Sequence, residues 1–270
     1  MLQSSMCSQL ARLKFYFLLG GKRTIMSIYK VGAMTNFLNA APNEIEVSKN
    51  FNNHHWICKG KRSLAIAVTL LQQNEIIAIP TDTIYGFAGI VSSTSSIKKL
   101  YEIKKRDKDK PLSISISNVN DIKKWGIVDH LPQDLLPILL PGPITIILKR
   151  TPALNPALNP NHDTVGIRIP YFKFINYVSE IVGPLALTSA NLSNETSCLY
   201  ASEFQNLWPM LGGIFYDSTK FGKSCSKLRK GSTIVDLSKP GYYEIVRAGV
   251  HVNGICSILK KFGILQKYSN

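Results

Sequence analysis

The stretch Ile76-Ile77-Ala78-Ile79-Pro80-Thr81-Asp82-Thr83-Ile84-Tyr85-Gly86-Phe87-Ala88-Gly89 decides how this chain can fold. Its first four residues form a short apolar run rich in β-branched side chains, which is typical of a buried strand. Pro80 has no N–H group to donate and therefore ends the hydrogen-bond ladder. Two hydroxyls and a carboxylate follow over 81–83, and the glycines beyond them let a ligand approach the backbone. The stretch predicts a strand that ends at a polar small-molecule site, and a polar turn between two strands is the alternative.

The composition is that of an ordinary globular protein with a large positive charge. Of the 270 residues, 45% are hydrophobic and 18% are charged, and 32 Lys and Arg against 17 Asp and Glu give a formal net charge of +15. This surplus suits a polyanionic partner, either ATP or RNA, and does not choose between them. The five cysteines and five histidines lack disulfide or metal-ligand spacing. They indicate a reducing compartment and predict no metal site built from protein side chains. We expect His54 and His55 to be solvated ahead of the folded body.

The first 43 residues differ from the rest, because they contain no acidic residue and five basic ones. Such a basic, acid-poor segment is typical of a mitochondrial transit peptide, and an extension without an address is the alternative. No apolar run reaches the roughly 18 residues that a membrane-spanning helix needs, so no transmembrane segment is expected. We therefore expect a cytoplasmic and/or mitochondrial protein. Its expected parts are an N-terminal extension over 1–60, one catalytic domain over 61–252, and a C-terminal helix and tail over 253–270.

Helical and strand patterns alternate along the chain without an internal repeat or linker. Helices are predicted over 63–73 with Ser63 as cap, over 95–105 with Thr94 or Ser95 as cap, and over 121–125, 132–140, 172–181, 202–211 and 252–262. Strands are predicted over 76–79, 90–91 after a glycine turn at 86–89, 112–117, 144–149, 165–169, 185–187, 214–217, 233–236 and 243–247. This mixture predicts a single α/β domain with a twisted mixed sheet and helices on its faces.

Three further stretches carry residues that suit a binding site. The basic run over 104–110 is either a phosphate clamp or a solvated helix end. Ser189-Ala190-Asn191 follows a short buried strand, where it could bond a ribose or phosphate or cap a helix. No histidine and acid are arranged to activate Ser189, so a hydrolase triad is not predicted. Arg168 stands in an apolar strand and should pair with an acid or bind an anion. Neither a Walker A loop nor a GxGxxG motif occurs in the sequence.

These stretches together resemble the YrdC-like threonylcarbamoyl-AMP synthases over about 63–250. The resemblance rests on six motifs in order: Pro80-Thr81-Asp82-Thr83-Ile84-Tyr85-Gly86, Lys104-x-Arg106…Lys110-Pro111-Leu112, Pro141-Gly142-Pro143-Ile144-Thr145, Asp163-Thr164-Val165-Gly166-Ile167-Arg168-Ile169-Pro170, Ser189-Ala190-Asn191 and Ser232-Thr233-Ile234-Val235-Asp236. It implies the single-domain form of that fold, built around a large basic concave cleft. It also implies synthesis of threonylcarbamoyl-adenylate and diphosphate from L-threonine, bicarbonate and ATP. A downstream threonylcarbamoyl transferase would then modify an adenosine of tRNA.

The same resemblance assigns roles to individual residues. It makes Lys104, Arg106 and Ser189 catalytic, and it assigns L-threonine to Thr83, Ser115, Arg168 and Ser232. It assigns the binding of ATP, together with Mg²⁺, to Arg106, Lys110, Thr164, Ser189, Asn191, Ser197 and Arg247. Three departures stand out: Asp107 and Thr188 where the family usually has proline, and a longer, more basic loop over 221–230.

Two other functions fit the same pattern. The first is a non-catalytic module that binds double-stranded RNA or tRNA in the basic cleft. The second is a carbamoyl-adenylate-forming domain of the hydrogenase-maturation type. Retention of Lys104, Arg106, Ser189, Asn191 and Arg247 favours catalysis over binding alone, because RNA binding needs only distributed positive charge. The free-standing length argues against the hydrogenase-maturation type.

Overall fold

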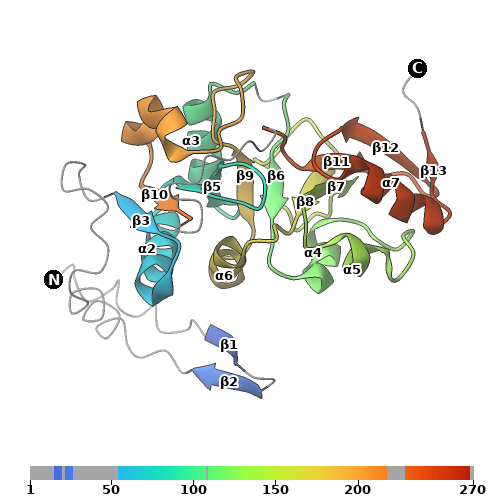
Figure 1. Cartoon of the computed structure of the whole chain (residues 1–270), viewed down its shortest axis with the longest axis horizontal. Coiled ribbons are helices and arrows are strands. Elements are labelled where there is room, and N and C mark those ends of the chain that lie inside the picture. Colours follow the sequence, from blue (N-terminus) through green and yellow to red (C-terminus); the bar gives the residue numbers. More distant parts are fainter. Residues whose placement is uncertain (1–14, 20–21, 27–53, 108, 218–228, 268–270) are drawn as a thin grey trace.

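A computed structural model describes residues 15–19, 22–26, 54–107, 109–217 and 229–267 of the chain (Figure 1). Strands β1 (Phe15–Leu19) and β2 (Lys22–Met26) form an antiparallel hairpin that is separate from the main sheet. The expected transit segment otherwise falls on residues outside this description, so it stays a prediction.

The main sheet has eleven strands that pair in both parallel and antiparallel directions. Their order across the sheet is β13 (Leu265–Gln266), β12 (Tyr242–Arg247), β11 (Thr233–Asp236), β7 (Ile144–Lys149), β8 (Thr164–Arg168), β6 (Ser113–Ser115), β9 (Leu185–Ser189), β5 (Gly86–Ile90), β4 (Ile77–Ile79), β10 (Gly213–Tyr216) and β3 (His55–Ile57). The helical segments are α2 (Gly60–Gln72), α3 (Thr94–Lys104), α4 (Ile122–Trp125), α5 (Leu135–Leu139), α6 (Lys173–Val182) and α7 (Val252–Lys261), with 3₁₀ turns η2 (Val119–Asp121) and η3 (Ala201–Met210). The predicted α/β fold with a twisted mixed sheet is confirmed.

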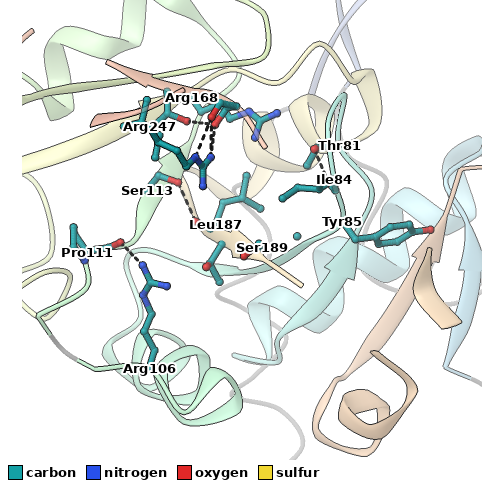
Figure 2. A pocket seen from close by; sticks show the side chains of 15 residues that line it. Thr81, Ile84, Tyr85, Arg106, Pro111, Ser113, Arg168, Leu187, Ser189 and Arg247 are labelled. Carbon is teal, nitrogen blue, oxygen red and sulfur yellow. Dashed lines mark hydrogen bonds between the residues drawn. The ribbon is translucent and has the colours of Figure 1, made fainter. Parts of the chain in front are cut away.

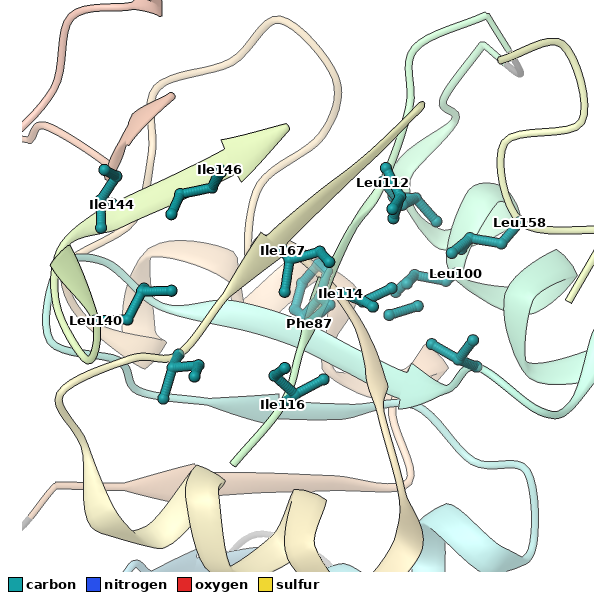
Figure 3. Packing of buried hydrophobic residues seen from close by; sticks show 14 of the residues in the cluster. Phe87, Leu100, Leu112, Ile114, Ile116, Leu140, Ile144, Ile146, Leu158 and Ile167 are labelled. Atoms are coloured by element: carbon teal, nitrogen blue, oxygen red, sulfur yellow. The ribbon is translucent and has the colours of Figure 1, made fainter. Parts of the chain in front are cut away.

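Strands β4, β5, β9 and β10 are buried on both faces because their side chains alternate between two hydrophobic cores. Along β4 and the residue before it, Ile76 and Ala78 belong to the larger core, whereas Ile77 and Ile79 belong to the smaller one. Helices α2 and α6 pack together over the smaller core (Figure 1). Helices α3, α4, α5 and α7 supply residues to the larger core, and Figure 3 shows Phe87 near its centre. Full burial of each large aliphatic side chain contributes about 1.5–3 kcal/mol.

One face of the sheet carries the smaller core over β4, β5 and β9. On the same face, the central strands β6 and β8 carry small and polar residues instead. In β6, Ile114 points into the larger core, so its neighbours Ser113 and Ser115 lie on the opposite face. Ser113 is level with Gly166 on β8 and with Leu187 on β9. Leu187 belongs to the smaller core. The apolar covering over β9 therefore gives way to a polar floor over β6 and β8.

The structure corrects several local predictions. Ser63 does not cap the first helix: α2 begins at Gly60, and the Ser63 hydroxyl donates to the carbonyl of Lys59. Ser93 caps α3, because its hydroxyl accepts from the backbone N–H of Ser96. The predicted glycine turn over 86–89 is strand β5, paired with both β4 and β9.

His55 is also not the solvated residue that was predicted. It lies in β3, which pairs with β10, and its Nδ1 is 2.7 Å from the hydroxyl of Tyr216. Burial is the larger cause, and nearby His54 the smaller, of a pKa for His55 below its usual value. The main sheet therefore starts before residue 61, the boundary that was expected.

Candidate active site

A cavity of about 140 Å³ lies on the polar floor of the central strands (Figure 2). Arg106 stands at one end of it and Arg168 and Arg247 at the other, with Ser189 between them. Its lining is formed by Thr81, Ile84, Tyr85, Gly86, Arg106, Pro111, Ser113, Thr145, Arg168, Leu187, Thr188, Ser189, Ser232, Ile234 and Arg247. The structure thus contains an arginine-lined pocket, and the large basic cleft that was expected stays a prediction.

Arg168 at the end of β8 is paired with an acid from the opening stretch. Its Nη2 bonds the carboxylate of Asp82 and also donates to the Thr83 hydroxyl at 2.8 Å. The second oxygen of Asp82 accepts the backbone N–H of Tyr171 at 3.1 Å. Burial lowers the pKa of Arg168, and the charge of Asp82 opposes that shift. Among the described residues, the buried Nε of Arg168 and the hydroxyl of Ser115 have no hydrogen-bond partner. Ser115 is level with Arg168 on the neighbouring strand.

Arg247 and Ser232 form the adjoining wall. The Arg247 Nη2 donates to the Ser232 carbonyl at 2.8 Å, and the Ser232 hydroxyl lies 2.8 Å from that of Thr145. Gly231 leaves room for this arginine, because a Cβ there would lie 2.7 Å from Nη2. Burial, and to a smaller degree the charge of Arg168, lower the pKa of Arg247. None of the ion pairs among the described residues involves Arg247, so its charge is available to an anion.

Arg106 is oriented by the backbone that follows it. Its Nε donates to the carbonyl of Lys110 and its Nη2 to that of Pro111, both at 2.9 Å. Burial lowers the pKa of Arg106, and Tyr101 opposes that shift. The ammonium of Lys110 instead donates to the side-chain oxygen of Asn194 at 2.8 Å, and Lys110 does not line the cavity.

Lys104 and Asn191 lie behind Ser189 and not on the cavity wall. The Lys104 Nζ donates to the carbonyls of Ser189 and Asn191. The Asn191 amide donates to the carbonyls of Leu192 and Glu195, and its Oδ1 has no partner among the described residues. Neither side chain belongs to the lining.

The structure thus brings some of the predicted site residues together and leaves others apart. The cavity is lined by Arg106, Arg168, Ser189, Ser232 and Arg247, while Thr83 and Ser115 adjoin Arg168. Ser197 does not line the cavity, and its carbonyl accepts from Arg229. Thr164 pairs with Lys149 at the far end of β8, about 13 Å along the strand from Arg168.

Three residues that contribute to this site, Ser113, Thr145 and Asp82, were not assigned a role from the sequence. Ser113 was detectable, because the strict alternation over 112–117 puts it on the same face as Ser115. Thr145 followed the proline–glycine turn that was already quoted. The pairing of Asp82 with Arg168 had no local signal, because the two residues are 86 positions apart.

Two of the three departures from the family pattern, Thr188 and Asp107, fall on described residues. Thr188 is part of the lining. The Asp107 carboxylate accepts the backbone N–H of Asp109 at 3.1 Å, so it stabilises a turn in the basic run. The loop over 221–230 lies outside the described residues except for 229–230.

The described residues contain neither a metal-binding cluster nor a membrane-spanning helix. No group of three or more His, Cys, Asp or Glu side chains gathers there where it could hold a metal ion. In the same part of the chain, every helix is too short or too polar to cross a bilayer.

Comparison with known proteins reveals clear similarity. The sequence model of the Sua5/YciO/YrdC family, described as "Telomere recombination", matches residues 69–249. The threonylcarbamoyl-AMP synthase of Homo sapiens is 40% identical over 211 residues, which cover 77% of this chain and 75% of the human protein. The Mus musculus protein of the same name is 42% identical over 206 residues, or 75% of this chain and 73% of its own.

A solved structure supports the fold. The crystal structure of P. abyssi Sua5 complexed with L-threonine matches with a TM-score of 0.67 and 21% sequence identity, covering 79% of this chain and 62% of that chain. This likeness concerns the arrangement of the backbone alone.

Proposed function

This chain belongs to the Sua5/YciO/YrdC family, and we propose that it works as a threonylcarbamoyl-AMP synthase. The observation that carries the proposal is the 40% identity to the human protein of that name over about three quarters of both chains. The family resemblance seen in the sequence is thereby confirmed, and the relatives support the catalytic interpretation over the non-catalytic one.

The proposed reaction has two bond-forming steps. The amine of L-threonine and bicarbonate join into a carbamate with loss of water. A carbamate oxygen then attacks the α-phosphorus of ATP, and diphosphate leaves as the threonylcarbamoyl-adenylate forms. This assigns the chain to the nucleotidyltransferases.

The cavity suits this reaction because it offers fixed positive charge and small hydroxyls. In the proposed arrangement Arg168, Thr83, Ser115 and Ser232 hold L-threonine, while Arg106, Ser189 and Arg247 face the phosphates. Asp82 already neutralises part of Arg168, so Arg106 and Arg247 supply the uncompensated charge. Such sites accelerate phosphoryl-group chemistry by positioning and by neutralising the charge that develops on the phosphate oxygens. No protein nucleophile is needed.

Further participants belong to the same proposal. The described residues offer no carboxylate cluster for a metal, so Mg²⁺ fits best as part of the ATP complex. The product would pass to a downstream transferase that modifies tRNA. We also propose that the protein works in the cytoplasm, in mitochondria or in both, which the basic, acid-poor segment over 1–43 motivates.

The test is diphosphate release from ATP and bicarbonate with and without L-threonine. We expect release that depends on threonine, and we expect Arg106→Ala and Ser189→Ala to lose roughly 100-fold in kcat while remaining folded. Lys98→Ala, on the exposed surface of α3, is the matched control and should keep full activity. Normal turnover in both site variants would refute the site assignment. No release from the wild type, with tRNA binding intact, would favour the non-catalytic RNA-binding module.

A further inference from the structure

Lys104 joins two parts of the cavity wall from behind. It is the last residue of α3 and is 1% exposed. Its Nζ donates to the carbonyl of Ser189 at 2.6 Å and to that of Asn191 at 2.5 Å. Its own backbone carbonyl accepts the N–H of Ser193 at 3.1 Å. One residue therefore makes three hydrogen bonds to the five-residue segment that leaves β9.

This link connects Arg106, at one end of the cavity, with Ser189 near its middle. Two residues after Lys104 the chain presents Arg106, after a left-handed turn at Lys105 with φ of 47°. On the other side, the carbonyl that Lys104 binds belongs to Ser189, which lines the cavity. A shift of Lys104 would therefore move Arg106 and Ser189 relative to each other. Errors of about 1 Å in such geometry can cost roughly 100-fold in rate.

The ammonium of Lys104 forms no ion pair with any of the described residues. The aromatic ring of Phe87 lies 6.0 Å from Nζ, and two carbonyl dipoles point at it. Burial of an uncompensated charge is unfavourable. The Lys104 amine should therefore gain a proton more readily when a negatively charged group binds nearby.

The charged and titratable groups around Lys104 act in opposite directions. Burial is the largest effect and the charge of Arg106 the next, and together they lower the pKa of Lys104 to about 7. Cys198 and Glu195 oppose this shift from the loop after β9. Both carbonyl bonds survive deprotonation, because a neutral amine still has two N–H groups. A change of pH therefore alters the charge behind the cavity and leaves the hydrogen bonds in place.

We propose that Lys104 is a positioning residue that holds Arg106 and Ser189 in place, and that the phosphate chain of ATP supplies its missing negative charge. This inference rests on the proposed function, since it takes ATP as the ligand of the cavity. It changes the role expected for Lys104 from catalytic to positioning, because the side chain does not reach the cavity. It also implies that ATP binding is coupled to uptake of a proton by the protein.

The sign of the coupling follows from linkage. The complex holds more protons than the free protein wherever the pKa of Lys104 rises on binding, so ATP affinity should fall as pH rises above about 7. Titration calorimetry of ATP in two buffers of different ionisation enthalpy measures the uptake directly. At about pH 7.5 we expect the wild type to take up roughly half a proton more than Lys104→Met does. The difference between the two proteins removes the protons that ATP itself binds.

Two further variants, Lys98→Met and Lys104→Gln, sharpen the test. Lys98→Met on the same helix should match the wild type in proton uptake and in kcat. Lys104→Met should lose at least about tenfold in kcat, through the lost hydrogen bonds to Ser189 and Asn191. If Lys104→Met does not fold, Lys104→Gln retains N–H donors without the charge and should lose the proton uptake. An uptake in the folded Lys104 variant equal to that of the wild type would overturn the proposal.

The calorimetry separates this inference from the proposed function. A wild type that binds ATP with the extra proton but releases no diphosphate would refute the synthase function and sustain the role of Lys104. Failure of the wild type to bind ATP would overturn both.

Discussion

Arg168 and Asp82 form a buried ion pair at one end of the candidate site, with side chains only 7% and 10% exposed. Removal of one partner from such a pair leaves an uncompensated buried charge, which typically costs about 3–5 kcal/mol. We therefore expect Asp82→Asn to lower the free energy of unfolding by about 3 kcal/mol, measured by urea denaturation. The asparagine side chain keeps one oxygen, and this oxygen can still accept the backbone N–H of Tyr171.

The exposed pair between Lys124 and Asp121 is the matched control. Its side chains are 60% and 38% exposed, and such pairs contribute under about 1 kcal/mol. Asp121→Asn should therefore have little effect. Similar losses of unfolding free energy in the two variants would show that the buried pair of Arg168 and Asp82 stabilises the fold no more than an exposed pair does.

The sequence predicted which types of residue form the site, but not all of the contacts between them. An arginine inside an apolar strand had to meet an acid or an anion, and Arg168 indeed meets Asp82. The partner itself could not be named, because only the folded sheet brings residue 82 beside residue 168. Thr164 and Ser197 entered the candidate list through the family resemblance, and neither lines the cavity.

Strands with regular alternation were predictable at the level of elements. Residues 112–117 alternate serine and aliphatic side chains, and the structure places Ile114 in the larger core as that pattern requires. Strand β5 was mistaken for a turn because two of its five residues are glycine. These glycines serve close packing: a Cβ on Gly86 would lie 2.8 Å from Leu187, and one on Gly89 would lie 2.5 Å from the Ser96 hydroxyl.

The packing of α3 on β5 depends on Gly89. A methyl group there would also lie 2.7 Å from Ile76 Cδ1, so the helix or the strand would have to shift. Overpacking of this kind typically costs about 1–3 kcal/mol, which is the loss in unfolding free energy that we expect for Gly89→Ala. Gly254→Ala in α7 is the control, because a Cβ added at Gly254 would meet no neighbouring atom within 4 Å. Alanine favours a helix by up to about 1 kcal/mol, so this variant should be as stable as the wild type or more stable. Equal stability of the Gly89 variant would contradict the packing argument.

At the scale of the whole molecule, the α/β class followed from the mixture of patterns, but the order of the strands did not. Strand β10 pairs with β3 and β4, which precede it by more than a hundred positions, and no local signal encodes such pairing. Strand β3 has only three residues, too few for a periodic pattern. The position of the cavity depends on pairing of the same kind, because the neighbouring strands β8, β6 and β9 bring Arg168, Ser113 and Ser189 to its wall.

The contribution of β3 to the whole fold can be measured by truncation. The indole of Trp56 packs on Phe215 with ring centroids 5.4 Å apart, and a Cβ on Gly213 would lie 2.6 Å from it. A chain that begins at residue 61 lacks this strand and exposes the edge of β10. We expect it to lose about 2 kcal/mol of unfolding free energy relative to a chain that begins at 54, because Trp56 is half-buried and loss of a fully buried tryptophan side chain costs about 3–5 kcal/mol. Trp56→Ala in the full chain should reproduce most of the loss, whereas equal stability of the two truncated chains would place the boundary of the folded body at residue 61.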